Sequence, residues 1–307
     1  MRQAFIAELV ACAARDPRVM LLTADLGFMV VEPFARAFPD RFVNVGVAEQ
    51  NMIGIATGLA EAGFIPFCYS IAAFATQRPY EFIRNGPVAH GLPVRIVGIG
   101  GGFDYGSAGA THHAIEDIAL MRALPGMTVL APADPAQAAA ALAASWALPG
   151  PVYYRLGREG QAVPGLDGHF ALGRADRLAQ GGDLLLVATG AMVAEAVRAA
   201  ALLDAQGIAA SVLGVASLHP APAEDLRQAI AAAPALMTLE AHGPVGGLRD
   251  LVTGIMAEAG LARPFRSIAV MAPDALTGSA AWLLQRHGLD AASVAKAAVA
   301  LLGRTAP

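Results

Sequence analysis

A single glutamate, Glu49, stands where an apolar stretch passes into a Gly- and Ala-rich one. Residues 42–45 alternate like a short buried strand, Gly46 permits a tight turn, and residues 53–60 continue as a closely packed helix. This order predicts a partly desolvated carboxylate near a helix N-terminus. Such a group either caps the helix and favours its dipole, or handles a proton for a buried ligand.

Two other segments carry side chains suited to ligand binding. Residues 71–85 have the pattern of an amphipathic helix after a strand, in which Phe74 is, on pattern alone, a core residue. Residues 98–113 form a glycine-dense loop that ends in the pair His112 and His113. The loop lacks a P-loop lysine and the spacing of a dinucleotide fingerprint, but its backbone would let a substrate approach a strand end. We expect no metal site there, because neighbouring histidines rarely chelate one ion and no cysteine or carboxylate has suitable spacing.

The bulk composition bounds the classes of partner. The chain has 307 residues, enough for about two domains. Only 15% of them are charged against about 25% in a typical protein, so we expect surface buried against a partner, with an Ala-rich, well-packed monomer as the alternative. A net charge of -4 without a polybasic stretch argues against nucleic acid and an anionic membrane. Cys12 and Cys68 lie in apolar surroundings and no signal peptide is visible, so we expect buried thiols and a cytoplasmic location.

Apolar β-branched runs alternate with longer helical patterns, which predicts parallel α/β layers. We expect two doubly wound domains at residues 1–160 and 183–307, joined by a linker at residues 161–182 that is rich in glycine and scattered charges. The expected strands cover residues 19–23, 42–45, 65–69, 94–99, 127–131, 152–155, 184–188, 209–215, 235–240 and 265–270. The expected helices cover residues 3–15, 49–62, 73–86, 114–123, 135–146, 191–206, 222–232, 246–259 and 290–302.

The wording around Glu49, VGVAEQNM, resembles the GIREHAM or GIAEQHA segment in the pyrimidine-binding domain of transketolase-like, thiamine-diphosphate-dependent enzymes. The resemblance implies that Glu49 activates the cofactor. A carboxyl group on N1′ of the aminopyrimidine promotes the tautomer that can take the thiazolium C2 proton. Residues 71–85 resemble the family's FxxxRAxEQIR helix, which implies that Phe74 stacks on the pyrimidine, and Ile71 stands where the family often has another aromatic residue of this cofactor platform.

The stretch GATHHAIEDIALMRALPGMTVLAPAD resembles the family's GPTHQPIETLAxxRxxPN. This implies that His112 stabilises the donor's oxygen beside the reacting carbon. His113 falls where the family has Gln and is a candidate substrate contact. Arg158 in YYRLGRE matches an arginine that holds a substrate phosphate, and Arg2 aligns with another. A plain surface cation is the alternative for each.

Two acidic positions have weaker counterparts in the family. Asp25 in TADLG resembles an acidic residue beside the cofactor and the subunit seam, with a turn aspartate as the alternative. Glu240 and His242 resemble part of the EEHxxxGGxG turn of the C-terminal domain, for which we expect a structural or interfacial role.

The chain also departs from the family pattern. Ala108 stands where transketolases carry an aspartate that reads a donor hydroxyl, and Gly100 and Met29 replace a histidine and a serine of the phosphate region. A standard pentose-phosphate exchange is therefore not expected. No GDG followed by an Asn-rich segment appears, so the part of a transketolase that binds Mg²⁺ and diphosphate is missing from this sequence.

These features together predict the second subunit of a split, transketolase-like enzyme. The expected partner is a subunit that carries the diphosphate- and Mg²⁺-binding domain, in an α2β2 assembly that shares thiamine diphosphate. The expected reaction moves a ketol or acyl unit from a ketose or 2-oxo donor to an aldehyde or sugar acceptor. Two alternatives remain: the β subunit of a 2-oxo-acid dehydrogenase E1, which passes its acyl group to a lipoyl arm, and a scaffold subunit without catalytic residues.

Overall fold

Two β-sheets organise the chain, whose computed structural model describes residues 1–272 and 275–303. The first sheet has the strand order β10-β5-β6-β4-β3-β1-β2, in which β10 is antiparallel to β5 and the other neighbours are parallel. Its strands are β1 (Val19–Thr23), β2 (Phe42–Asn44), β3 (Ile65–Ile71), β4 (Arg95–Ile99), β5 (Thr128–Leu130), β6 (Val152–Leu156) and β10 (Ser217–His219). The expected α/β fold class is confirmed.

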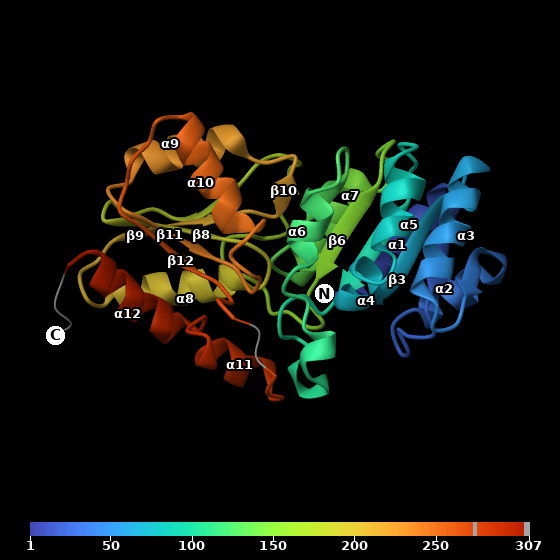
Figure 1. Cartoon of the computed structure of the whole chain (residues 1–307), viewed down its shortest axis with the longest axis horizontal. Helices are drawn as coiled ribbons and strands as arrows, with labels where there is room; N and C mark the ends of the chain where they lie inside the picture. Colours follow the sequence, from blue (N-terminus) through green and yellow to red (C-terminus); the bar gives the residue numbers. More distant parts are fainter. Residues whose placement is uncertain (273–274, 304–307) are drawn as a thin grey trace.

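Helices cover both faces of this sheet (Figure 1). Successive strand residues point to opposite faces, so Leu21 joins the core under α1 and α7, whereas Leu22 joins the core under α3 and α6. The helices of this half are α1 (Arg2–Arg15), α2 (Glu32–Ala37), α3 (Glu49–Glu61), α4 (Ala72–Thr76), α5 (Tyr80–Ile83), α6 (Asp117–Arg122) and α7 (Pro135–Ser145). Cys12 and Cys68 are both buried free thiols, as expected.

The second sheet has the strand order β12-β11-β8-β9-β7, with β7 antiparallel to β9. Its strands are β7 (Asp176–Ala179), β8 (Leu184–Ala188), β9 (Ala210–Gly214), β11 (Leu236–Leu239) and β12 (Phe265–Ile268). In Figure 1, α9 and α10 lie on one face of this sheet and α8 and α12 on the other. The helices are α8 (Met192–Asp204), α9 (Ala223–Ala232), α10 (Leu248–Glu258), α11 (Ala280–Arg286) and α12 (Ala291–Leu301). No helix in the described part of the chain is long and apolar enough to cross a membrane.

Several elements differ from the expected ones. The single helix expected at residues 73–86 is instead α4, α5 and a π-helical turn at residues 84–88, because Pro79 interrupts the run. The helix expected at 114–123 begins only at Asp117, since Ala114 forms a β-bridge with Gly102. Short elements α2, α11, β7 and β10 were not expected, and β7 lies inside the segment 161–182 expected to be a linker. The division of the chain at residues 160 and 183 stays a prediction.

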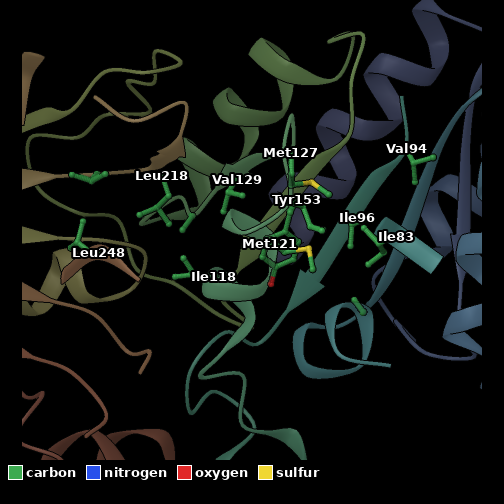
Figure 2. Close-up of a cluster of buried hydrophobic side chains, with 14 of the residues drawn as sticks. Ile83, Val94, Ile96, Ile118, Met121, Met127, Val129, Tyr153, Leu218 and Leu248 are labelled. Atoms are coloured by element: carbon green, nitrogen blue, oxygen red, sulfur yellow. The ribbon is translucent and has the colours of Figure 1, made fainter. Parts of the chain in front are cut away.

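A shared core joins the two halves of the chain. Figure 2 shows Leu218 and Leu248 from the second half beside Ile118 and Val129 from the first, and all four are buried in one hydrophobic cluster. Strand β10 extends the first sheet with residues from the second half. The two sheets are therefore parts of one packed body.

A buried polar contact crosses the same boundary. Arg155 Nε donates to Asp117 Oδ2 at 2.8 Å, and Arg155 Nη2 donates to the backbone oxygens of Ala114 and Ala241, each at 2.9 Å. Tyr153 Oη donates to the same Asp117 oxygen at 2.6 Å. One guanidinium thus links the two halves without leaving its charge unpaired, as a buried ion requires.

Candidate active site

The carboxyl ends of β1, β2, β3 and β4 meet at one edge of the first sheet. Thr23 at the end of β1 is in register with Asn44 of β2 and Tyr69 of β3, and Ile71 of β3 is in register with Ile99 of β4. The loops that leave these strands therefore converge at the place where open parallel sheets bind ligands.

Glu49 is the first residue of α3 and is 1% exposed. Its Oε1 accepts a hydrogen bond from Ser70 Oγ at 3.0 Å, and its Oε2 accepts one from Arg78 Nη1 at 2.9 Å. Both donors are side chains from β3 and the segment after α4, and no side-chain cap bond forms at the N-terminus of α3. The carboxylate is therefore aimed at the sheet edge rather than used as a helix cap.

Phe74 and His112 are linked to this carboxylate through Arg78. The Phe74 ring, in α4, contacts the His112 ring edge-on with centroids 4.9 Å apart, and the guanidinium carbon of Arg78 lies 4.0 Å from the Phe74 centroid. The His112 Nδ1 is 2.9 Å from Thr111 Oγ1. A carboxylate, an aromatic face and an imidazole thus share one corner of the sheet edge.

Arg78 is the contact that the sequence interpretation missed. It is 41% exposed at its side chain, forms an ion pair with Glu49 and covers the Phe74 ring. The available signal was the arginine in FxxxRAxEQIR, which Arg78 matches, but the interpretation assigned a role only to the aromatic residue.

Arg2 and Arg158 lie together, joined to His112 through Tyr105. Arg2 Nε donates to the backbone oxygen of Arg158 at 2.8 Å, and the Arg158 guanidinium carbon lies 5.4 Å from the Tyr105 centroid. The Tyr105 and His112 centroids are 6.4 Å apart. A cavity of about 420 Å³ lined by both arginines, Met1 and Glu159 adjoins this pair.

The other predicted positions take different surroundings. Asp25, with φ of 54°, accepts from Asn44 Nδ2 at 2.9 Å and so ties the loop after β1 to β2. Ile71 is half-buried at the start of α4. His113 is 4% exposed, packs edge-on against Phe103 at 5.1 Å, and its Nε2 has no hydrogen-bond partner within the described ranges.

Apolar side chains surround the loops next to Glu49 and Asp25. Phe28, Met29 and Val47 are 73%, 89% and 71% exposed, respectively. Three such side chains on the two adjacent loops form what we call the apolar rim. Exposed apolar side chains gathered on neighbouring loops are typical of surfaces that bind another molecule.

Glu240 and His242 lie at the boundary between the two halves, away from this corner. Glu240 accepts from the backbone N–H groups of Leu248 and Arg249 at 2.7 and 2.9 Å, and so caps α10. Burial raises the pKa of Glu240 to about 7. Burial lowers the pKa of His242, whose Nε2 accepts from the backbone N–H of Ala119 at 3.2 Å. Both side chains thus hold backbone groups in place.

Comparison with known proteins identifies the family of the chain. Residues 1–161 match the transketolase pyrimidine-binding domain family, and residues 173–294 match the transketolase C-terminal domain family. The chain is 37% identical to the 6-deoxy-6-sulfo-D-fructose transketolase subunit SqwH of Clostridium sp. (strain MSTE9), over 97% of this chain and 93% of that one. It is 34% identical to one of the apulose-4-phosphate transketolase subunits of Phocaeicola vulgatus, over 97% of this chain and 96% of that one.

A solved structure shares both the sequence and the fold. It is described as a split gene transketolase, inactive beta4 tetramer, and it superposes with a TM-score of 0.88 at 39% identity, over 98% of this chain and 97% of that one. The resemblance seen in the motifs around Glu49 and His112 is confirmed, and this chain belongs to the transketolase family.

Proposed function

We propose that this chain is the second subunit of a split transketolase that uses thiamine diphosphate to transfer a ketol or acyl unit from a ketose or 2-oxo donor to an aldehyde or sugar acceptor. The observation that carries the proposal is the corner formed by Glu49, Phe74 and His112. A buried carboxylate beside an aromatic face and an imidazole is the set of groups that an aminopyrimidine and a polarised carbonyl require.

The corner fits the cofactor's pyrimidine ring in one specific respect. The Arg78 guanidinium is flat, carries nitrogen donors, lies over the Phe74 ring at 4.0 Å and donates to Glu49 at 2.9 Å. An aminopyrimidine is also flat and nitrogen-bearing, so it can replace Arg78 on the same two partners. Arg78 is partly exposed at its side chain and has room to turn toward water.

Each side chain then has a defined task. Glu49 would hold a proton at a ring nitrogen, Phe74 would stack on the ring, with Ile71 and Asp25 beside it, and His112 would donate a hydrogen bond to the donor's oxygen. Thiamine diphosphate, when bound, supplies the carbon-carbon chemistry. His113, the other candidate substrate contact, is buried and packs on Phe103.

The proposal includes a partner subunit that holds the diphosphate and Mg²⁺ and completes an α2β2 assembly. Among residues 1–272 and 275–303, no group of three or more His, Cys, Asp or Glu side chains could hold a metal ion. Relatives of similar length are described as transketolase subunits. The apolar rim of Phe28, Met29 and Val47, on loops next to Glu49, supports contact with the partner at the site itself.

The far end of the substrate would meet Arg2 and Arg158. Arg2 donates to the Arg158 backbone oxygen, and both residues line the same cavity of about 420 Å³, so two positive charges are available there for a terminal anion. Two of the relatives are named for substrates that carry a sulfo group or a phosphate. We propose the same type of chain end for the substrate of this enzyme.

The test is Glu49→Gln in the complex reconstituted with the partner subunit. We expect kcat to fall by about 10²–10⁴-fold, because the amide cannot exchange a proton with a ring nitrogen. Glu61→Gln, an exposed glutamate at the end of the same helix, is the matched control and should retain activity. Full turnover of Glu49→Gln would instead support the scaffold alternative.

A further inference from the structure

Tyr105 occupies the space that a side chain at residue 100 would need. Gly100 follows β4 and has φ of 78°. A Cβ atom added there would lie 2.2 and 2.3 Å from Tyr105 Cε2 and Cδ2, far inside van der Waals contact. The position of the Tyr105 ring therefore depends on a glycine at residue 100. The phenol ring occupies the space that a side chain at residue 100 would take.

The ring lies between the two ends of the proposed substrate path. His112, which marks the reacting end, is 6.4 Å from the Tyr105 centroid, and the Arg158 guanidinium, which marks the anionic end, is 5.4 Å from it. Burial raises the pKa of Tyr105, whereas the charges of Arg2 and Arg158 lower it. The hydroxyl is thus a neutral donor within electrostatic reach of both arginines. Within the described ranges, no hydrogen bond uses this hydroxyl.

We infer that Tyr105 is a specificity-determining residue, whose hydroxyl donates a hydrogen bond to the end of the donor substrate that lies away from the reacting carbon. The inference rests on the proposed function and deepens it. The ligand class is an open-chain ketose that ends in a tetrahedral oxyanion, either a phosphate ester or a sulfonate. The arginines supply the positive charge, and Tyr105 supplies a directional contact without adding charge.

Tyr105→Phe in the reconstituted complex tests this assignment, because it removes the hydroxyl and keeps the ring. The donors are D-xylulose 5-phosphate, 6-deoxy-6-sulfo-D-fructose and hydroxypyruvate, with glycolaldehyde as acceptor. We expect KM to rise about tenfold for the anion-terminated donor that the wild type uses, with kcat unchanged, as for a lost hydrogen bond to a charged group. Hydroxypyruvate has no chain beyond the bond that breaks, so its KM and kcat should stay within about twofold.

The comparison of the two anionic donors identifies which oxyanion the wild type prefers. Tyr80→Phe, on α5, is the matched control for the loss of a tyrosine hydroxyl. An equal rise in KM for all donors, or no change in KM for any of them, would overturn the role of Tyr105 but not the proposed function. Absence of wild-type turnover with every donor, hydroxypyruvate included, would overturn the proposed function and this inference with it. Calorimetric titration of the cofactor-free complex with the preferred donor gives a readout independent of turnover, and Kd should rise about tenfold in Tyr105→Phe.

Gly100→Ala tests the steric coupling. The added methyl group must push the Tyr105 ring away, so the variant should show the same donor-selective rise in KM. Because the hydroxyl is already displaced, combining Gly100→Ala with Tyr105→Phe should raise KM no further than the larger single effect. Independent, multiplying effects on KM would show that the glycine and the tyrosine act separately.

Discussion

The two side chains that donate hydrogen bonds to Glu49 differ in exposure. Ser70 is fully buried, whereas Arg78 is partly exposed and covers the Phe74 ring. A buried carboxylate that loses one of its two donors is less stable, because its charge is no longer balanced away from water. Arg78 is therefore expected to contribute to the stability of this corner in the chain as it stands.

Arg78→Ala should lower the free energy of unfolding of the chain by about 1–2 kcal/mol. Urea denaturation at neutral pH measures this difference. Arg84→Ala is the matched control, since the Arg84 side chain is exposed and donates to the neighbouring Asn85 side chain, and we expect less than about 0.5 kcal/mol from it. Equal effects of the two substitutions would show that the contact between Arg78 and Glu49 contributes nothing to folding.

The sequence predicted residues of the corner unevenly. Glu49 stood out because an acidic residue at a strand-to-helix junction is unusual in an apolar stretch, whereas Phe74 looked like a core residue and gained a role only through the family motif. No pattern in the sequence pointed to Tyr105. Its position depends on contacts with Gly100, across the turn that follows β4, and with Arg158, which is distant along the chain. Contacts of this kind depend on the folded backbone and not on local spacing.

At the level of elements, α10 begins on a carboxylate instead of a conventional capping residue. Glu240 of the β11 end accepts two N–H groups of α10, and a Cβ on Gly247 would lie 2.0 Å from Glu240 Oε2. Gly247 is therefore required by the close approach of the carboxylate. The two N–H bonds favour the charged form, but burial is the larger effect and raises the pKa to about 7.

This raised pKa makes the stability of the fold depend on pH. The folded state holds the Glu240 proton more tightly than the unfolded state, in which the pKa of Glu240 is about 4.5. The stability that the protonated carboxyl group contributes to the fold is therefore fully present below about pH 4.5 and is lost as pH rises through 7. The loss is about 3 kcal/mol. His242, with a lowered pKa, acts in the opposite direction and loses stability as pH falls below about 6.5.

Glu240→Gln separates the two contributions. Urea denaturation at pH 5, 6, 7 and 8 should show that the free energy of unfolding of the wild type falls relative to that of the variant as pH rises, because the variant's amide, like the protonated carboxyl group, has no charge to bury. A difference that is constant with pH would contradict the protonation of Glu240 in the folded chain. Asp250→Asn is the control for a general change of charge, because Asp250 is an exposed residue of the same helix that accepts from the backbone N–H of Gly246.

Strands were predicted well where both of their faces are buried, as for β1 and β8. The failures were short or context-dependent elements. β10 has three residues and exists because it pairs with β5 of the first sheet, a partner far away in the sequence that no local pattern reveals. The helix expected at 73–86 is interrupted at Pro79. The prediction followed the apolar periodicity and did not take account of the backbone N–H group that proline lacks.

For the whole molecule, β10, the shared core and the Arg155 contacts tie the two halves together. A boundary with a continuous core and a buried guanidinium that pairs with Asp117 does not open without exposing apolar side chains of both halves. The halves are therefore expected to unfold as one unit, although the sequence suggested a linker between them.

The two tryptophans provide a direct measurement, because Trp146 lies in the first half and Trp282 in the second. Trp282→Phe and Trp146→Phe each leave one reporter, and their fluorescence transitions in urea should have coincident midpoints that also match the loss of helical circular dichroism. Distinct midpoints for the two variants would show that the halves unfold separately.

The apolar rim of Phe28, Met29 and Val47 also bears on the solubility of the chain. If nothing covers this edge, its exposed apolar side chains favour contact between copies of the chain. Production of the chain by itself would then favour aggregation, and co-production with a subunit that covers the edge would reduce it.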